Sequence, residues 1–338
     1  MSIKDVLFDL CSADGVSGDE FSAAYIAYNE LKKLTDSVYV DDFGNVFASI
    51  DNKKEKTILL DAHIDQVGFI VTYITEDGFL KFSPVGGIDK RLLPASQVEI
   101  ILKDEKIPGV ITSVPPHLST DSDKAPSYDD LYIDTGLSGD EAKKRIPLGS
   151  RVLFNGEPTE LLGDRISSKA LDDRAGVAVI LHALELVGDL SKYNIDIAFS
   201  CQEETGESGA KMLSFRSECD LAIAVDVSFA YSKGEDKTKC GEMGKGPMIG
   251  IAPSLSKAFS DSLIKTAEEC DIPYQIEVMS GETGTDADAI GISKGGVKTV
   301  TVSIPLKYMH TPLEVIALSD IDNTAILISE FLKSGDVI

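Results

Sequence analysis

Two adjacent glutamates, Glu203 and Glu204, follow the apolar run "NIDIAFS" in the segment "SCQEETGESGA". Adjacent carboxylates repel each other, so a pair at the end of a core strand calls for a compensating charge. Bound cations can offset the repulsion, and a chain that turns after a strand need not point neighbouring side chains to opposite faces. The pair therefore suggests a metal site at the edge of a buried sheet.

Other potential metal ligands stand at the ends of predicted strands or at a helix start. His63 ends the run "TILLDAH", Asp226 ends the apolar run "LAIAVD", and His310 follows "VKTVTVSIP". Asp172 lies at the start of a helix predicted over residues 168–188. Open α/β sheets build their sites outside the carboxyl ends of their strands, so these side chains can converge. Two histidines and three carboxylates suit a pair of divalent cations such as zinc, cobalt or manganese, and Asp172 is the candidate for the shared carboxylate.

Each of these residues also has a simpler interpretation. A carboxylate such as Asp172 at a helix start is commonly an N-cap, and Asp226 alone would be an ordinary turn residue. His63 alone would fit a structural role equally well. Their common position at strand ends favours the metal site. The chain has no HExxH or HxxEH helix and no GxSxG elbow, so a zincin site and a serine nucleophile are disfavoured.

The elements that must position these residues alternate between helices and strands. An amphipathic helix to about Leu34 opens the chain, and strand and helix patterns alternate again from residue 158 onward. This alternation predicts an α/β fold with a mainly parallel sheet and helices on both faces. Residues 67–157 instead contain short β-type runs between Gly-, Pro- and Asp-rich turns, with one helical piece near "SGDEAKKR". We therefore predict a catalytic domain of residues 1–66 and 158–338, and an inserted small β-barrel-like domain at residues 67–157.

The composition restricts the partners of the chain. Its 56 acidic and 32 basic residues give a formal net charge of -24, which would repel phosphate backbones and anionic lipid headgroups. Nucleic acid and membrane surfaces are therefore disfavoured. The N-terminus has no signal-peptide pattern and no stretch approaches the roughly 20 apolar residues of a membrane span, so we expect a cytoplasmic location. The five cysteines are scattered singly and are expected to be reduced thiols.

Six segments along nearly the whole chain follow one family pattern: "DAHIDQVGFIV", "PVGGIDKRLLP", "KALDDRAGV", "QEETGESGA", "AVDVSFA" and "YMHTPLEVI". On these segments the chain resembles the tetrahedral aminopeptidases, a group that includes glutamyl aminopeptidases and proteins labelled FrvX or cellulase M. The resemblance implies an aminopeptidase with two divalent metal ions per subunit that removes N-terminal residues from short peptides. It also implies that the β insertion forms dimers, which assemble into a hollow dodecamer.

The resemblance further implies a role for each ligand. His63 and Asp226 would hold one metal, and Glu204 and His310 would hold the other. Asp172 would bridge the two.

Two more residues receive roles by the same resemblance. Glu203 would be the general base, taking a proton from a metal-bridging water that attacks the peptide carbonyl. Asp65 would orient His63, which is physically sensible because residues i and i+2 of a strand share a face. The family pattern also implies a cis peptide bond between Asp172 and Asp173.

Two alternative functions remain open at this stage. An endoglucanase-type glycosidase, suggested by the cellulase label, would use two carboxylates that flank a sugar bond and no metal. A non-catalytic scaffold descended from peptidases would not need the full ligand set. Loss of activity on chelation would separate the glycosidase from the peptidase.

Overall fold

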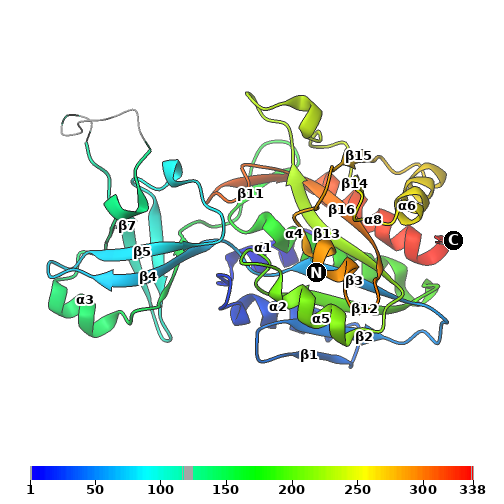
Figure 1. The fold of residues 1–338 in the computed structure, drawn as a ribbon, viewed down its shortest axis with the longest axis horizontal. Coiled ribbons are helices and arrows are strands. Elements are labelled where there is room, and N and C mark those ends of the chain that lie inside the picture. Colours follow the sequence, from blue (N-terminus) through cyan, green and yellow to red (C-terminus); the bar gives the residue numbers. More distant parts are fainter. Residues whose placement is uncertain (1, 116, 118–124, 336, 338) are drawn as a thin grey trace.

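The computed structural model describes residues 2–115, 117, 125–335 and 337, which form an α/β lobe and a β-barrel lobe beside it (Figure 1). Both marked chain ends belong to the α/β lobe. None of the helices in these residues is long and apolar enough to cross a membrane.

One sheet of 11 strands, counted over the described residues, forms the centre of the α/β lobe. Its path is β1 (Val38–Val40), β2 (Val46–Ile50), β12 (Asn194–Ser200), β3 (Thr57–His63), β13 (Leu221–Phe229), β16 (Lys298–Lys307), β17 (Glu314–Ala317), β11 (Arg165–Ser168) and β10 (Thr159–Glu160). Off this path, β14 (Met248–Ile251) pairs with β16 and with β15 (Gln275–Val278).

The central strands β12, β3, β13 and β16 run parallel to one another. The strands toward both edges pair antiparallel. The predicted mainly parallel α/β fold is therefore confirmed. The sequence "VYVDDFGNVFASI" also predicts a hairpin that turns near Gly44 and Asn45, and the antiparallel pair of β1 and β2 at one edge of the sheet confirms it.

Strand β3 shows why the centre of the sheet is buried on both faces. Ile58 and Leu60 pack into one hydrophobic cluster, whereas Leu59 packs into another on the opposite face. Side chains alternate between the faces of a strand, so a strand with successive apolar residues needs a cover on each side. Helices supply both covers.

The helices are distributed over the two faces as predicted. The first cluster contains buried residues of α1 (Ile3–Ser12), α2 (Phe21–Leu31), α4 (Leu171–Val187), α6 (Lys257–Glu269) and α8 (Leu318–Ser334). The second contains residues of α5 (Ser208–Arg216) and α7 (Asp286–Gly291). Short 3-10 helices are η1 (Lys90–Leu92), η3 (Tyr128–Asp130), η4 (Gly188–Leu190) and η5 (Lys237–Lys239).

The single opening helix expected up to about Leu34 is wrong, because α1 and α2 are separate helices. The segment between them pairs with the chain just after β3: Ser17 N donates to Gln66 O at 3.1 Å, and Gln66 N donates to Gly15 O at 2.9 Å. Gly18 in this segment has a φ of +84°, a conformation that glycine adopts readily. The break brings the start of the chain close to the predicted site.

The barrel lobe closes in the order β4 (Gly68–Ile74), β5 (Leu80–Val85), β8 (Ile133–Asp134), β7 (Lys106–Ile111), β6 (Gln97–Ile101) and β9 (Arg151–Phe154). Its core contains Phe69, whose ring lies edge-on to Phe82 and Phe154 with centroids 5.1 and 5.3 Å apart. The predicted helical piece is α3 (Gly139–Arg145). A small closed barrel is thus present, although residues 116 and 118–124 of the predicted insertion lie outside the described residues.

Candidate metal centre and active site

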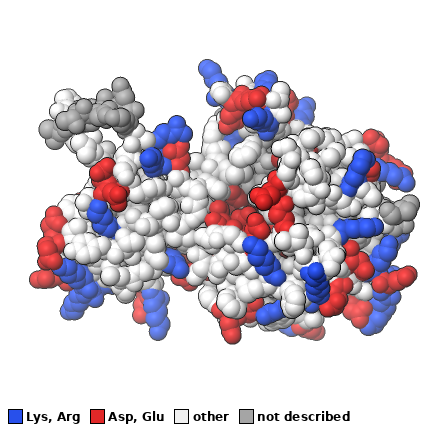
Figure 2. Space-filling view, in the orientation of Figure 1, with Lys and Arg blue, Asp and Glu red and all other residues white. Residues whose placement is uncertain are grey.

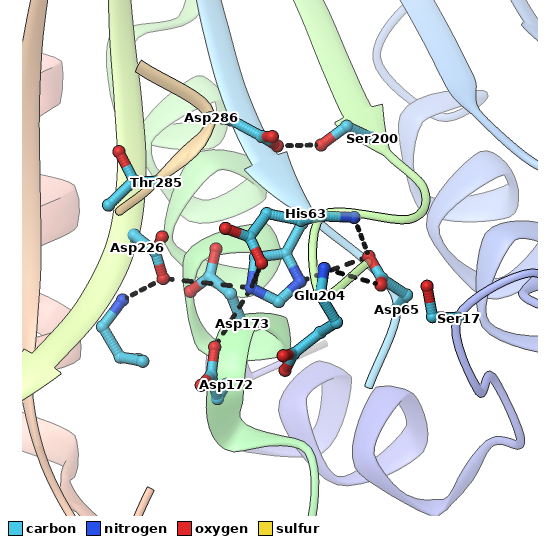
Figure 3. A network of polar contacts seen from close by, with 12 residues as sticks. Ser17, His63, Asp65, Asp172, Asp173, Ser200, Glu204, Asp226, Thr285 and Asp286 are labelled. Carbon is cyan, nitrogen blue, oxygen red and sulfur yellow. Dashed lines mark hydrogen bonds and ion pairs between the residues drawn. The ribbon is translucent and has the colours of Figure 1, made fainter. Parts of the chain in front are cut away.

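His63 is the last residue of β3, at the carboxyl end of the central parallel strands, and its side chain is 3% exposed. One ring nitrogen, Nδ1, lies 3.4 Å from Oδ1 of Asp65. The other, Nε2, lies 3.0 Å from Oδ1 of Asp172. The imidazole is therefore held between two carboxylates, with Asp65 on the side expected of a residue that orients the ring (Figure 3).

Asp172 lies at the start of α4, where its backbone is non-helical with φ −81° and ψ 106°. The peptide bond between Asp172 and Asp173 is cis, as the family resemblance implied. The N-cap alternative for Asp172 is wrong, because Asp173 Oδ1 accepts the backbone N–H of Gly176 at 3.0 Å instead. The Asp172 carboxylate is therefore directed toward the histidines.

The two oxygens of Asp172 face different histidines. Oδ1 lies 3.0 Å from Nε2 of His63, and Oδ2 lies 3.1 Å from Nε2 of His310. The residues come from the ends of different elements, β3, α4 and the loop after β16. A carboxylate with one nitrogen ligand at each oxygen has the arrangement required to bridge two cations.

The paired glutamates are fixed by Asp65. The backbone N–H of Glu203 donates to Asp65 Oδ1 at 3.0 Å, and that of Glu204 donates to Oδ2 at 3.2 Å. Beyond this turn the two side chains separate: Glu203 Oε2 lies 3.9 Å from His63 Nε2, whereas Glu204 Oε1 lies 3.3 Å from His310 Nε2. Adjacent glutamates are thus placed beside different histidines.

Asp226 joins the site from within a strand. Strand β13 continues to Phe229, so the expectation that an apolar strand ends in Asp226 is wrong, and so is the turn-residue alternative. Asp226 Oδ1 lies 3.9 Å from His63 Nε2 and accepts the N–H of Val227 at 2.7 Å. Its place on the strand beside β3 brings it to the level of His63.

His310 reaches the site from the loop between β16 and β17 with a backbone φ of 60°. Its Nδ1 lies 2.6 Å from the carbonyl oxygen of Gly87, in the segment that follows barrel strand β5. An Nδ1–H that donates to this carbonyl leaves Nε2 as the nitrogen that can bind a cation. The position of His310 therefore depends on a contact between the two lobes.

A buried glutamate that the sequence did not point to supports two of the predicted ligands. Glu314, at the start of β17, is 2% exposed. Its Oε1 accepts the backbone N–H of His310 at 2.8 Å, and its Oε2 accepts that of Asp172 at 3.2 Å. Glu314 thus accepts the backbone N–H groups of two predicted ligands, as Asp65 accepts those of Glu203 and Glu204.

Other buried polar residues lie near the site without lining its cavity. Asp61 and Asp286 are buried carboxylates, and Ser200 Oγ donates to Asp286. Glu20 is also buried, and its Oε1 accepts the N–H groups of Gly18 at 2.5 Å and Gln202 at 3.3 Å. Asp61 stands in the segment "DAHIDQVGFIV" and Asp286 in "GTDADA", which also fits the family pattern, whereas Glu20 has no such signal in the sequence.

The electrostatics of the site show an excess of carboxylates. Burial raises the pKa of Glu203 to about 9, although His63 acts in the opposite direction. Burial likewise raises the pKa of Asp226 and of Glu204. Burial lowers the pKa of His310, but Asp172 and Glu204 outweigh it and raise that pKa to about 11. So many buried carboxylates can all be ionised only when cations neutralise them.

The donor set fits divalent cations. Ligand atoms of His63, Asp172 and Glu204 lie within 4.8 Å of one another, as do those of His63, Asp173 and Asp226. Nitrogen and carboxylate donors in such groups suit zinc, cobalt or manganese. The site opens into a cavity of about 330 Å³ that is lined by His63, Gly87, Asp172, Glu203, Glu204, Glu207, Asp226, Val227, Gly284, Met309 and His310. A hollow with acidic side chains lies at the centre of the face shown in Figure 2.

The sequence and the fold both match known aminopeptidases. Residues 44–327 match the model of the M42 glutamyl aminopeptidase family. A lysyl aminopeptidase of Pyrococcus furiosus is 31% identical over 337 residues, covering 97% of this chain and 96% of that protein.

Among solved structures, an aminopeptidase of Desulfurococcus kamchatkensis is 34% identical with a TM-score of 0.92, covering 98% of this chain and 94% of that one. The TET1 peptidase of Pyrococcus horikoshii is 32% identical with a TM-score of 0.86, covering 98% and 99% of the two chains. That peptidase is described as assembling into a tetrahedron or a large octahedral shell.

Proposed function

The chain belongs to the M42 glutamyl aminopeptidase family, and we propose that it is a dinuclear metallo-aminopeptidase that removes N-terminal residues from short peptides. Aminopeptidase activity accords with the family match and with the relatives. The two metals, their ligands and the catalytic roles are the proposal.

One observation carries the dinuclear proposal: the Asp172 carboxylate presents Oδ1 to His63 and Oδ2 to His310. In the proposed site, His63 and Asp226 would hold one cation, Glu204 and His310 would hold the other, and Asp172 would be the carboxylate shared by both. The distance of 3.3 Å between His310 Nε2 and Glu204 Oε1 supports the second pair. His63 Nε2 lies 3.9 Å from both Asp226 and Glu203, so the choice of Asp226 as the ligand rests on the family resemblance. Zinc and cobalt are the preferred candidates, followed by manganese.

Bound cations would polarise the peptide carbonyl and make a water more acidic. Glu203 accepts a proton from the attacking water as the oxygen–carbon bond forms, and returns it to the leaving amine as the carbon–nitrogen bond breaks. Asp65 fixes the backbone of Glu203 and orients His63. Glu314 fixes the backbones of Asp172 and His310.

The experiment that tests this function is metal removal and restoration. Protein treated with a chelator should lose hydrolysis of aminoacyl-p-nitroanilides, and zinc, cobalt or manganese should restore it. Titration of the stripped protein should give two equivalents of bound metal per chain. Undiminished peptidase activity in fully stripped protein would contradict the proposal.

The same experiment addresses the two alternatives. A glycosidase would hydrolyse soluble cellulose derivatives and would be insensitive to chelation, because its two carboxylates need no metal. A scaffold would show no turnover under any condition. The close approach of carboxylates to both histidines supports the metallopeptidase instead.

We also propose that the chain forms a closed homo-oligomer, with residues 67–157 as the domain that makes the dimer contacts and a dodecamer as the assembly. The assembly described for the TET1 peptidase of Pyrococcus horikoshii supports this proposal. Light scattering at several protein concentrations would test it, and a stable monomer would contradict it. The cytoplasmic location expected from the sequence stays a prediction.

A further inference from the structure

The catalytic cavity contains one ionisable side chain outside the proposed metal ligands and general base. That residue is Glu207. The remaining lining groups are Val227, Met309, Gly87 and Gly284, and none of the described residues that line the cavity is lysine or arginine. The cavity wall beyond the proposed metal ligands and general base therefore has a surplus of negative charge.

Glu207 is placed at the cavity wall by the turn that carries the paired glutamates. It is the N-cap residue of α5 with a left-handed φ of 57°, and its backbone N–H donates to Glu203 O at 3.1 Å. These contacts fix Glu207 four residues beyond the general base. A group on this wall can reach the side chain of a residue whose peptide bond lies beside Glu203.

The Glu207 carboxylate is only loosely neutralised by the protein. Lys211 Nζ lies 3.8 Å from Glu207 Oε2, whereas it donates to the carbonyl of Gly206 at 2.8 Å. The Glu207 side chain is 26% exposed and that of Lys211 is 56% exposed, so the ion pair is weak. The carboxylate can therefore accept a cation from a substrate.

The loop of residues 280–285 adds to the negative field. Asp288 Oδ2 accepts the N–H groups of Thr283 at 2.7 Å and Gly284 at 3.0 Å, which fixes the loop whose Gly284 lines the cavity. Burial raises the pKa of Glu207, and the charges of Asp288 and Glu282 raise it further against the effect of Lys211. Three carboxylates thus act on the same region, in which a cation would be stabilised and an anion repelled.

We propose that the cavity selects peptides whose N-terminal residue is lysine or arginine, and that Glu207 binds the cationic end of that side chain. The carboxylate of Glu207 would repel the side chain of an N-terminal glutamate or aspartate. This specificity rests on the proposed peptidase function, because it concerns the residue on the amino side of the bond that Glu203 helps to cleave.

The test compares kcat/KM for lysyl-, arginyl-, leucyl- and glutamyl-p-nitroanilide in metal-loaded protein. The wild type should prefer the lysyl and arginyl substrates, with the glutamyl substrate the poorest. Glu207→Gln should lower kcat/KM for the two basic substrates by about tenfold, as expected for loss of one partly buried charge pair, and should leave the leucyl substrate within about twofold. Glu207→Lys should lower kcat/KM further for the two basic substrates and should raise kcat/KM for the glutamyl substrate.

A matched control is Glu55→Gln, which removes one carboxylate from the exposed turn before β3 and should not change the order of substrates. An equal loss on all four substrates in Glu207→Gln would assign Glu207 to the substrate α-amino group and overturn the specificity. A wild-type preference for the leucyl or glutamyl substrate would overturn it as well. Absence of hydrolysis of every substrate would instead overturn the peptidase function, and this specificity with it.

Discussion

Asp172 presents its Oδ2 oxygen to Nε2 of His310 at 3.1 Å. Its Oδ1 oxygen faces the corresponding nitrogen of His63 at 3.0 Å. The relationship joins the start of α4 to a loop after β16, and the sequence separation of these residues means that only the tertiary fold can create it. In the proposed mechanism this carboxylate sets both cations relative to each other.

Asp172→Asn tests the bridging role. The asparagine amide has one acceptor oxygen and no charge, whereas the carboxylate has two charged oxygens. Affinity for both metals should therefore fall together, and peptide turnover should fall with it. Calorimetric titration of the stripped protein with zinc would measure this. Asp189→Asn, an exposed change in η4, is the control and should leave both affinities unchanged. Loss of one metal with normal affinity for the other would contradict a bridging Asp172.

Glu314→Gln tests whether the two hydrogen bonds that Glu314 accepts from the backbones of Asp172 and His310 stabilise the site. Glutamine has one acceptor oxygen, so one of the two N–H donors, on Asp172 or His310, would lose its partner in a buried place. We expect the free energy of unfolding of the metal-loaded protein to fall by about 1–3 kcal/mol, together with weaker metal binding. Urea unfolding with and without metal would check this. Unchanged metal affinity and stability would show that Glu314 does not support the site.

Gly86→Ala tests the contact between the lobes at the site. An added Cβ would lie 2.7 Å from Val67 Cγ1 and 3.3 Å from Glu204 Oε2, at a φ of +83°. Gly136→Ala is a matched control, because Gly136 has a φ of +72° and no atom within 4 Å of the added Cβ. Both variants should lose about 1–2 kcal/mol of stability from the left-handed backbone, but only Gly86→Ala should weaken metal binding and turnover. Equal metal affinities in the two variants would contradict this contact.

Glu20 gives the folded protein a pH-dependent stability. Burial and then the charge of Asp65 raise the pKa of Glu20 from 4.5 to about 8. Between these values the unfolded chain has lost a proton that the folded chain still binds, so the free energy of unfolding should decrease as pH rises from about 4.5 to about 8.

Glu20→Gln removes this proton and keeps an acceptor for Gly18 and Gln202, since both N–H groups bind the same oxygen. The slope of unfolding free energy against pH in this window should become less negative by up to about 1.4 kcal/mol per pH unit. Urea titrations of chelated protein at several pH values would measure the difference. Parallel curves for the two proteins would contradict a protonated Glu20.

The fold was predictable where the sequence has strong periodic patterns. The apolar runs of β3, β12, β13 and β16 and the amphipathic patterns of α4 and α8 identify the central layers, and turn-rich short strands identify the barrel. The break between α1 and α2 was not predicted, because the segment between the two helices pairs with the chain after β3, far away in the sequence. At one edge, the sequence "VYVDDFGNVFASI" identifies the hairpin of β1 and β2, whereas β10 and β11 at the other edge are short and have little pattern of their own.

The candidate site was predictable where ligands stand at strand ends, as His63 and the paired glutamates do. Asp226 was correctly included although β13 continues beyond it. Glu314 and Gly87 stand in the segments "YMHTPLEVI" and "PVGGIDKRLLP", but their roles were not predicted. The hydrogen bond of Glu314 with Asp172 and that of the Gly87 carbonyl with His310 join residues 142 and 223 positions apart. Residue type and spacing do not predict hydrogen bonds between residues so far apart in the sequence.

The central claim assigns Glu203 to proton transfer and Glu204 to metal binding, and metal content measured together with turnover in two variants tests it most directly. Glu203→Gln should keep two metals per chain and lose turnover by about 10²-fold to 10⁴-fold, the usual effect of removing a general base. Glu204→Gln should bind metal more weakly at one of the two sites, and excess metal should restore part of its activity. Excess metal should restore no activity to Glu203→Gln. Loss of a metal from Glu203→Gln, or two tightly held metals in Glu204→Gln, would contradict the account.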